Sequence, residues 1–462
     1  MKLNKKYGFW TVLASTLAAI VGSSIIISFN MVFALSEANP LLMILAWVFG
    51  ALIVLPDAFI VIEPSIGYGE SGSGYSWIRK CNWRILAFWF GWVLILFVSA
   101  TSLASCCSAM SSMITQILEL NPEEIAVETL QKSLAIFILI FLAGIQIMIK
   151  NSSKYTQLFF LFVKTLPIIL VFILAIMYGS KDGLLSNSEM NKNLGHAYIS
   201  SAMLIPAITY TGFAYSGHEF PTYITEEIEN PKKTIPWVII SAVLIVLVIY
   251  VCYGIALLSL ATPDSNGNWI NPGGTTSSIF AQHRWAVLTF NIFAIFLFIG
   301  SVNSLLFFQS RLIHKLSETG DVHSVFGKVH KKTNQPYMAI ILLCCVAVFY
   351  ILFSSISEII SSFALATSVL KILLNSSIIK LRLKDPEYKK IYGNKTFWTL
   401  MILSLVTCAL TFIGSIYLMV IMPHQQTGAS TFSILWKPIL MVLIAFLVYL
   451  FGIFKFNNIK IK

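Results

Sequence analysis

The sequence predicts an all-α integral membrane protein with about twelve transmembrane helices, and three observations lead to this prediction. Of the 462 residues, 57% are hydrophobic and only 11% are charged, and the mean hydropathy is +0.82. A soluble domain carries roughly a quarter charged residues and needs them to cover its surface. The apolar residues also gather in runs that are long enough to cross a bilayer, and the positive charges are divided unequally between alternate connections.

The apolar runs define the expected spans, because a helix needs about 20 apolar residues to cross the hydrocarbon core. In chain order the runs are 9–35, 40–62, 85–118, 133–150, 156–179, 198–227, 235–260, 285–313, 337–354, 357–381, 397–421 and 433–455. The first run is too long for a cleavable signal peptide and is taken as the first span. Runs longer than 25 residues are expected to tilt, break or extend beyond the lipid. The whole chain, 1–462, is therefore expected to form one transmembrane domain.

The positive charges predict the orientation of these spans. If the N-terminus is inside, only five of the 31 Lys and Arg residues fall on the outer side: Lys132, Lys181, Lys192, Arg284 and Lys437. Lys164 and Lys371 fall within spans, and the remaining 24 lie inside. By the positive-inside rule, both termini are expected in the cytoplasm of a multi-pass protein of the cell membrane. This distribution accounts for the net charge of +11, so no nucleic-acid partner is expected.

The sequence contains few residues or motifs that would indicate catalysis, nucleotide binding or metal binding. Six of the seven cysteines lie inside apolar runs, where we expect small buried side chains without disulfides or zinc spacing. No P-loop lysine motif, Gly-x-Ser-x-Gly elbow or zinc-protease helix occurs in the sequence. No cofactor, metal site or catalytic residue is therefore predicted.

Two spans are interrupted by small or polar residues at membrane depth. The first contains Gly22-Ser23-Ser24, and the sixth contains Ser216-Gly217-His218-Glu219. Because the two spans lie five apart, we expect a five-plus-five inverted repeat with broken helices one and six. Repeat one would cover about 9–179 and repeat two about 198–381, followed by two helices over about 397–455.

Broken helices suggest a binding site for a zwitterion. The half-helix after Gly22 would present free N–H groups and a positive dipole end, which suit a carboxylate. Unwound carbonyl groups around Ser216 and Gly217 would suit an ammonium group. The alternative is that Gly22-Ser23-Ser24 is a small-residue contact between helices.

Several stretches resemble the amino acid–polyamine–organocation superfamily of permeases, and the likeness extends over nearly the whole chain. The stretches are 8–25, Glu63 with 71–77 (Ser-Gly-Ser-Gly-Tyr-Ser-Trp), 213–219 (Phe-Ala-Tyr-Ser-Gly-His-Glu), 225–236 (Thr-Glu-Glu-Ile-Glu-Asn-Pro-Lys-Lys-Thr-Ile-Pro) and 310–312 (Ser-Arg-Leu), which ends the eighth span. Residues 163–167 (Val-Lys-Thr-Leu-Pro) and Lys371 resemble the L-amino-acid transporter and fructoselysine-type branch. The resemblance implies the LeuT-type fold.

The resemblance also implies a function. It implies a secondary active permease or antiporter that moves an amino acid or a derivative by alternating access. The residues implied at the substrate are Gly22, Ser23, Ser24, Phe213, Ser216, Gly217 and His218. The family usually has Gly-Ser-Gly at the first break, so the extra hydroxymethyl group of Ser24 would alter the substrate pose.

Ionisable and aromatic residues within the spans are implied in coupling and gating. In several relatives a lysine at the place of Lys164 fills the sodium position, so transport is expected to be independent of sodium. Glu219 would link protonation to transport, and Tyr215 would belong to an aromatic gate. Lys371 could meet a substrate carboxylate or pair with Asp57. Structural alternatives exist: snorkelling for Lys164, a capping bond for Glu219 and a core position for Tyr215.

Other functions are weighed against this one. A proton-coupled symporter of amines or glycated amino acids is the nearest alternative, and a channel or a membrane-embedded enzyme belongs to a different class. An enzyme would need converging catalytic groups, and a channel would need a continuous polar face on several helices. The expected partners are a small amino-acid-like solute and the lipid bilayer. The identity of the solute and the oligomeric state stay open.

Overall fold

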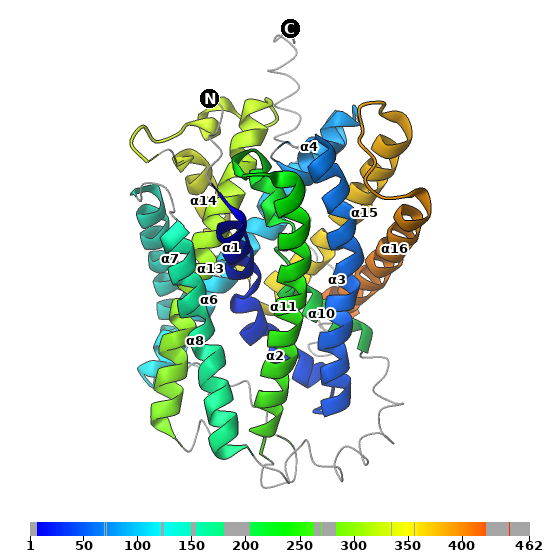
Figure 1. The fold of residues 1–462 in the computed structure, drawn as a ribbon. Helices are drawn as coiled ribbons and strands as arrows, with labels where there is room; N and C mark the ends of the chain where they lie inside the picture. Colours follow the sequence, from blue (N-terminus) through cyan, green and yellow to red (C-terminus); the bar gives the residue numbers. More distant parts are fainter. Residues whose placement is uncertain are drawn as a thin grey trace.

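The fold is a bundle of long helices, seen in a computed structural model of the chain (Figure 1). The structure describes residues 7–68, 70, 72–121, 124–148, 154–179, 204–262, 269, 283–333, 335–354, 356–421 and 443. Within these ranges every extended regular element is a helix, and an isolated β-bridge joins Tyr7 to Ile228. The predicted span 433–455 lies almost wholly outside the described residues.

The described helices follow one another along the chain in two halves. The first half contains α1 (Phe9–Ile20), α2 (Ser23–Leu35), α3 (Pro40–Tyr68), α4 (Ser73–Lys80), α5 (Arg84–Val93), the π-helix η1 (Leu94–Ser99), α6 (Ala100–Ile117), α7 (Ile125–Met148) and α8 (Lys154–Tyr178). The second half contains α10 (Leu204–Ala214), the 3₁₀-helix η3 (Phe220–Glu227), α11 (Pro231–Ser259), α13 (Arg284–Glu318), the 3₁₀-helix η4 (Ser324–Gly327), α14 (Tyr337–Phe353), α15 (Ile356–Lys384), α16 (Asn394–Ile416) and η5 (Tyr417–Ile421).

The prediction of an all-α membrane fold is confirmed. Among the described residues, eight helical segments are long and apolar enough to cross a membrane, and they match eight of the twelve predicted spans. The others are the broken sixth span, the 17-residue α14, the more polar α15 and the span outside the described ranges. Length and composition alone therefore identify most of the membrane-spanning segments.

The outer surface of the bundle is apolar. Phe137 on α7 is 66% exposed, Ile176 on α8 is 85% exposed and Val248 on α11 is 62% exposed. Such side chains would be costly in water but are stable against lipid tails. The expectation that the cysteines within spans are buried was wrong for Cys252 and Cys345, whose side chains are exposed on this surface. A small apolar side chain can face lipid as easily as a core.

Several helices extend past the predicted apolar runs. The eighth span, predicted to end near 313 with 310–312 as its close, continues as α13 through Glu318. The span predicted to start at 133 starts at Ile125, where Glu128 and Lys132 form an i,i+4 ion pair of 2.7 Å. Polar helix formers prolong a helix beyond the lipid, and hydropathy does not register them.

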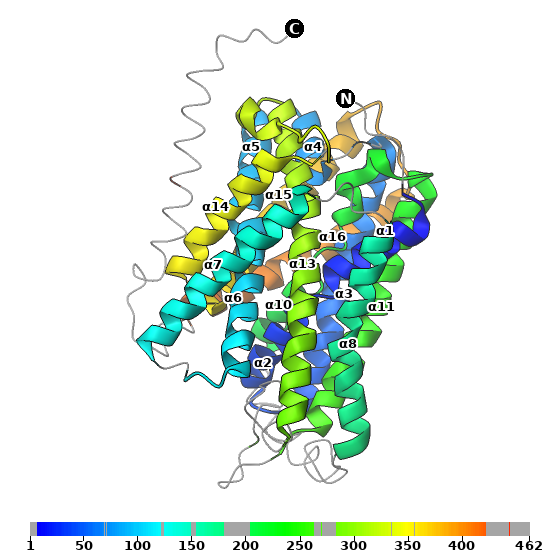
Figure 2. The same ribbon diagram turned by 90° about the vertical axis from the view of Figure 1, so that its left-hand side faces the viewer.

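Both predicted interruptions are present. Helix α1 ends at Ile20, the backbone of Val21 and Gly22 is extended, and α2 begins at Ser23. Helix α10 ends at Ala214, and a turn that contains Gly217 leads to the 3₁₀-helix η3. Figure 1 shows α1 and α2 following one another in the middle of the bundle, and Figure 2 gives the same arrangement from the side. The five-plus-five repeat and its boundaries stay predictions.

Buried ion pairs join helices at the end of the bundle where α3 and α15 terminate. Arg382 lies 2.5 Å from Glu63, and both side chains are almost fully buried. The Arg382 guanidinium also stacks over the ring of Phe397, 4.1 Å from its centroid. Glu63, one of the residues that carry the family resemblance, therefore ties α3 to α15.

Two further polar contacts lie near the same end. Arg79 on α4 lies 2.7 Å from Asp321, which also accepts a 2.5 Å hydrogen bond from the Tyr75 hydroxyl. Burial, followed by the negative charge of Asp321, raises the pKa of the Tyr75 phenol, so it remains a donor. Arg311 on α13 lies 3.1 Å from Glu227 at the end of η3, which ties the broken sixth span to the eighth.

Candidate functional site

The two unwound segments lie side by side. The Tyr250 hydroxyl on α11 lies 2.9 Å from the carbonyl oxygen of Ile20 and 3.2 Å from that of Ala214, the last residues of α1 and α10. The Ser24 hydroxyl donates a long, 3.4 Å hydrogen bond to the Ala214 carbonyl. The single hydroxyl hydrogen of Tyr250 can therefore be donated to either carbonyl group, or be shared between the two, where the helix ends leave these groups without helical partners.

A cavity of about 530 Å³, here called the break cavity, opens between these segments. Its lining combines both breaks with one face of α6 and one face of α13: Ala19, Gly22, Ser24, Val98, Ser102, Cys106, Ser216, Gly217, Glu219, Phe220, Ser301, Leu305, Gln309 and Phe363. Four of the predicted substrate residues, Gly22, Ser24, Ser216 and Gly217, therefore border one space.

Gly22 is in contact with α13. A Cβ atom at this position would lie 2.8 Å from the Ser301 hydroxyl oxygen and 3.6 Å from the Ser301 Cβ. The glycine therefore permits close packing of the first break on α13. Such packing is what the alternative interpretation of Gly22-Ser23-Ser24, a small-residue contact between helices, predicts. The first N–H groups of α2 still lack helical partners, because no turn precedes them. Close packing on α13 and free N–H groups therefore occur together at the first break.

Gly217 shapes the second break. Its φ of +107° lies in the region that favours glycine, so a side chain here would strain the backbone. The Gly217 N–H donates to the Glu219 carboxylate at 3.1 Å, and its carbonyl accepts from the Phe220 N–H at 3.1 Å. Glu219 therefore has the structural bond that was one of its two alternatives, and it also lines the cavity.

Lys164 reaches the first break from α8. Its side chain is fully buried, and its ammonium group donates a hydrogen bond to the carbonyl oxygen of Ala18 in the last turn of α1. Helix α8 packs on both α1 and α13. A cation at this place compensates the negative end of the α1 dipole. Burial excludes the snorkelling alternative, in which the ammonium would reach water.

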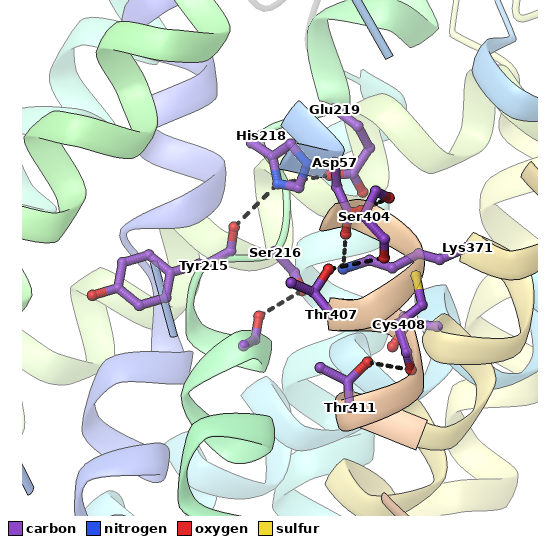
Figure 3. A network of polar contacts seen from close by, with 12 residues as sticks. Asp57, Tyr215, Ser216, His218, Glu219, Lys371, Ser404, Thr407, Cys408 and Thr411 are labelled. Carbon is purple, nitrogen blue, oxygen red and sulfur yellow. Dashed lines mark hydrogen bonds and ion pairs between the residues drawn. The ribbon is translucent and has the colours of Figure 1, made fainter. Parts of the chain in front are cut away.

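A second cavity of about 780 Å³, here called the lateral cavity, adjoins the break cavity and shares Val98, Ser216, Glu219 and Phe363 with it. Figure 3 shows the polar groups around it. Lys371 on α15 lies 2.6 Å from Asp57 on α3, so the predicted alternative of an ion pair is present. The Ser404 hydroxyl on α16 donates to the other Asp57 oxygen.

His218 lines the lateral cavity and not the break cavity. Its Nδ1 atom lies 3.4 Å from the Tyr215 carbonyl oxygen and 3.5 Å from a Glu219 carboxylate oxygen. The histidine therefore meets a backbone group and borders a cavity at once. The lateral cavity is lined by five titratable side chains: Asp57, His218, Glu219, Tyr223 and Lys371.

The remaining predicted site residues are placed differently. Tyr215 is fully buried, donates a 2.9 Å hydrogen bond to the Trp47 carbonyl and packs against the Trp47 and Tyr250 rings. It lines neither cavity, which matches the core alternative in this conformation. Ser23 and Phe213 lie in α2 and α10, but their side chains are outside the described residues.

Several residues at the site were not predicted from sequence. They are Tyr250, Ser301 and Gln309, together with Asp57 as a lining residue of the lateral cavity. Gln309 is buried, and its Oε1 atom has no hydrogen-bond partner among the described residues. A polar side chain in an apolar run was the available signal for each of them. Within the described ranges, no group of three His, Cys, Asp or Glu side chains is placed to hold a metal ion.

Comparisons with known proteins agree with this geometry. The chain is 24% identical over 400 residues to the human b(0,+)-type amino acid transporter 1. The matched region covers 84% of this chain and 78% of that protein. It is also 24% identical over 347 residues to the human large neutral amino acids transporter small subunit 2, covering 74% of this chain and 63% of that protein. The sequence model of the amino acid permease family matches residues 7–451. The chain therefore belongs to the amino acid permease family.

Proposed function

We propose that this permease binds the zwitterionic head of an amino acid in the break cavity and carries it across the cell membrane by alternating access. The observation that carries the proposal is the pairing of two broken helices around one cavity, with Gly22 and Ser24 on one side and Ser216 and Gly217 on the other. Helix N-termini bind carboxylates, and unwound carbonyl groups bind ammonium ions. An amino-acid zwitterion carries both groups.

The membrane arrangement proposed is the one predicted from the charges. Both termini would lie in the cytoplasm, because that orientation leaves 24 of the 31 Lys and Arg residues inside. The buried Glu63–Arg382 pair would then lie toward the cytoplasm. Similarity to two named amino acid transporters supports amino acids as substrates. Whether a second subunit accompanies this chain stays open.

Transport in a purified system tests the proposal. The protein is reconstituted into sealed vesicles, and uptake of labelled alanine, leucine and lysine is measured with and without unlabelled amino acid inside. Saturable uptake that internal amino acid accelerates is expected, with the solute recovered unchanged. Uptake that rises linearly with concentration and shows no acceleration would indicate a channel, and a modified solute would indicate an enzyme.

We expect the uptake to be independent of sodium. The Lys164 ammonium is bonded to the Ala18 carbonyl at the end of α1, and a second cation in contact with it would be repelled. Initial uptake rates in sodium chloride and in choline chloride of equal ionic strength should agree within about twofold, since no binding step is lost. A rate that rises steeply with sodium at constant ionic strength would contradict the role given to Lys164.

Replacing Glu219 by glutamine should change how transport responds to pH. Glu219 borders both cavities, and its carboxylate accepts the Gly217 N–H, a bond that the amide oxygen of glutamine can keep. Glu219→Gln is therefore expected to bind substrate but to lose much of the dependence of uptake on pH, because the amide cannot titrate. Initial rates are compared over a series of pH values in matched vesicles. Superimposable profiles for wild type and variant would leave Glu219 a purely structural residue.

The same vesicles separate exchange from proton symport. Proton coupling is supported by a cluster of titratable groups beside the site, since such groups can accept and release a proton. The cluster consists of Asp57, His218, Glu219 and Lys371. If an inward proton gradient drives accumulation of amino acid in vesicles without internal substrate, the permease is a symporter. If accumulation requires internal amino acid, it is an exchanger.

A further inference from the structure

The break cavity extends well beyond its two unwound segments. On α13 its wall contains Ser301, Leu305 and Gln309, which are spaced four residues apart and therefore share one face of the helix. Eight residues of α-helix extend about 12 Å, so Gln309 lies far along the cavity from Ser301 and the first break. The ammonium and carboxylate groups of an amino acid are attached to the same carbon atom, so one head cannot contact Gly22 and Gln309 together.

The third span faces α13 along this cavity and runs in the opposite direction. Asn291 near the start of α13 donates a 3.5 Å hydrogen bond to Gln116 near the end of α6. At the other end, a Cβ atom at Gly91 on α5 would meet the Leu316 side chain near the end of α13. Gln309 therefore lies toward the end of the bundle where the third span begins.

The walls around Gln309 are mainly apolar. On the third span the lining residue at the same level is Val98 in η1, because Val98 and Gln309 each lie seven residues from the contact with Leu316. The Val98 carbonyl group already accepts hydrogen bonds from two α6 hydroxyl groups, at 2.7 and 3.1 Å. On another side, the Phe220 ring packs on the ring of Phe308, the neighbour of Gln309, with centroids 4.9 Å apart. An ammonium group that passes this level therefore has few partners in the wall.

The Gln309 amide can be such a partner. Its side chain is 2% exposed and lines the cavity, and its Oε1 atom has no hydrogen-bond partner among the described residues. A buried acceptor without a donor lowers stability, so this amide calls for a ligand that donates a hydrogen bond. Glu219 borders the break cavity where Val98 does, at its junction with the lateral cavity, and its side chain keeps 29% exposure.

We propose that Gln309 guides the amino acid along the cavity: its amide oxygen accepts a hydrogen bond from the ammonium group after the head has left the first break. Glu219 faces the same junction and shares the ammonium group with Gln309. In the proposed orientation this end of the cavity faces the cytoplasm, so Gln309 acts on exchange with the cytoplasmic solution. The inference rests on the proposed function, because the head must first bind between Gly22 and Ser216.

Gln309→Met tests this role, because methionine has a similar length and flexibility but carries no amide. The initial rate at which vesicles loaded with L-alanine exchange it for saturating labelled L-alanine should fall at least about tenfold, since the ammonium group loses a hydrogen bond during passage. Thermal stabilisation by alanine, which reports binding at the first break, should stay within about twofold. The midpoint of thermal unfolding without ligand should not fall, because an apolar side chain replaces an unpaired buried amide.

Two further variants are the controls. Gln309→Asn keeps an amide on a shorter side chain and should exchange alanine faster than Gln309→Met. Gln146→Met makes the same substitution on α7, at a residue that is 3% exposed and lines neither cavity, and should exchange at the normal rate per folded protein.

Each other outcome contradicts the proposal in a different way. Normal exchange by Gln309→Met would mean that the amide binds only water. A joint loss of exchange and thermal stability would make Gln309 a structural residue, and equal rates for Gln309→Asn and Gln309→Met would show that the amide is not the active group. If wild type binds and exchanges alanine in all these cases, only the role of Gln309 fails. If alanine neither stabilises the wild type nor is exchanged by it, the proposed function fails as well.

Discussion

Gly22→Leu is expected to abolish amino-acid binding and uptake while the protein still inserts into the membrane. The new side chain would meet the Ser301 hydroxyl, which lies 2.8 Å from the ideal Cβ position, and would fill the break cavity in front of the first N–H groups of α2. Losing two charge-assisted hydrogen bonds at about 1.5–3 kcal/mol each corresponds to about 100-fold or more in affinity. Initial uptake and thermal stabilisation by ligand are the measurements.

Two control variants separate the site from general packing. Gly144→Leu makes the same substitution in α7 at a position where an added Cβ meets nothing within 4 Å, and it should transport normally. The double variant Gly22→Ala with Ser301→Ala removes the 2.8 Å contact and leaves the next one at 3.6 Å, an ordinary distance. The double variant should therefore have a higher free energy of unfolding than Gly22→Ala alone. Full uptake by Gly22→Leu would disprove the assignment of the break cavity.

Lys164→Met is expected to lower uptake by about tenfold or more with a small change in stability. Loss of the bond to the Ala18 carbonyl costs about 1–3 kcal/mol, whereas removal of a fully buried ammonium group relieves a desolvation cost of several kcal/mol. The free energy of unfolding should therefore change little. Without the cation, the end of α1 loses the charge that compensates its dipole beside the site.

The measurement is uptake in vesicles together with the midpoint of thermal unfolding. Lys132→Met is the matched control, because Lys132 pairs with Glu128 on the exposed face of α7 and should leave both quantities unchanged. A Lys164→Met variant that transports at the normal rate would reduce Lys164 to a packing residue. A variant that fails to fold would instead show that the Ala18 contact outweighs the cost of burying the charge.

Much of the fold could be predicted from sequence because lipid imposes a one-dimensional rule. Every backbone group must be paired within its own segment, so each span appears as a run of about 20 apolar residues. The same rule makes interruptions visible: Gly22 and Gly217 stand out because unwound backbone is tolerated only beside protein or water. Motifs such as 213–219 and 225–236 then allowed the family to be recognised.

Helix ends were less predictable than spans. Helix α13 continues through Glu318, and α3 continues through Tyr68, because polar residues outside the lipid can stay helical. Cys252 and Cys345 likewise show that an apolar run does not reveal which of its faces is buried. A helix that is apolar all round has no polar stripe that would indicate which side faces the lipid and which side faces the other helices.

By itself the sequence determined the class of protein, most of its spans, the two breaks and the candidate residues within them. Only the tertiary structure decided which of those residues meet. It placed Gly22 against Ser301, Lys164 on the Ala18 carbonyl and Tyr250 between the two helix ends. It also paired Asp57 with Lys371, which are 314 positions apart, in a second cavity. The physical reason is that hydropathy specifies how deep a residue lies in the bilayer, whereas its neighbours depend on how each helix is rotated and packed.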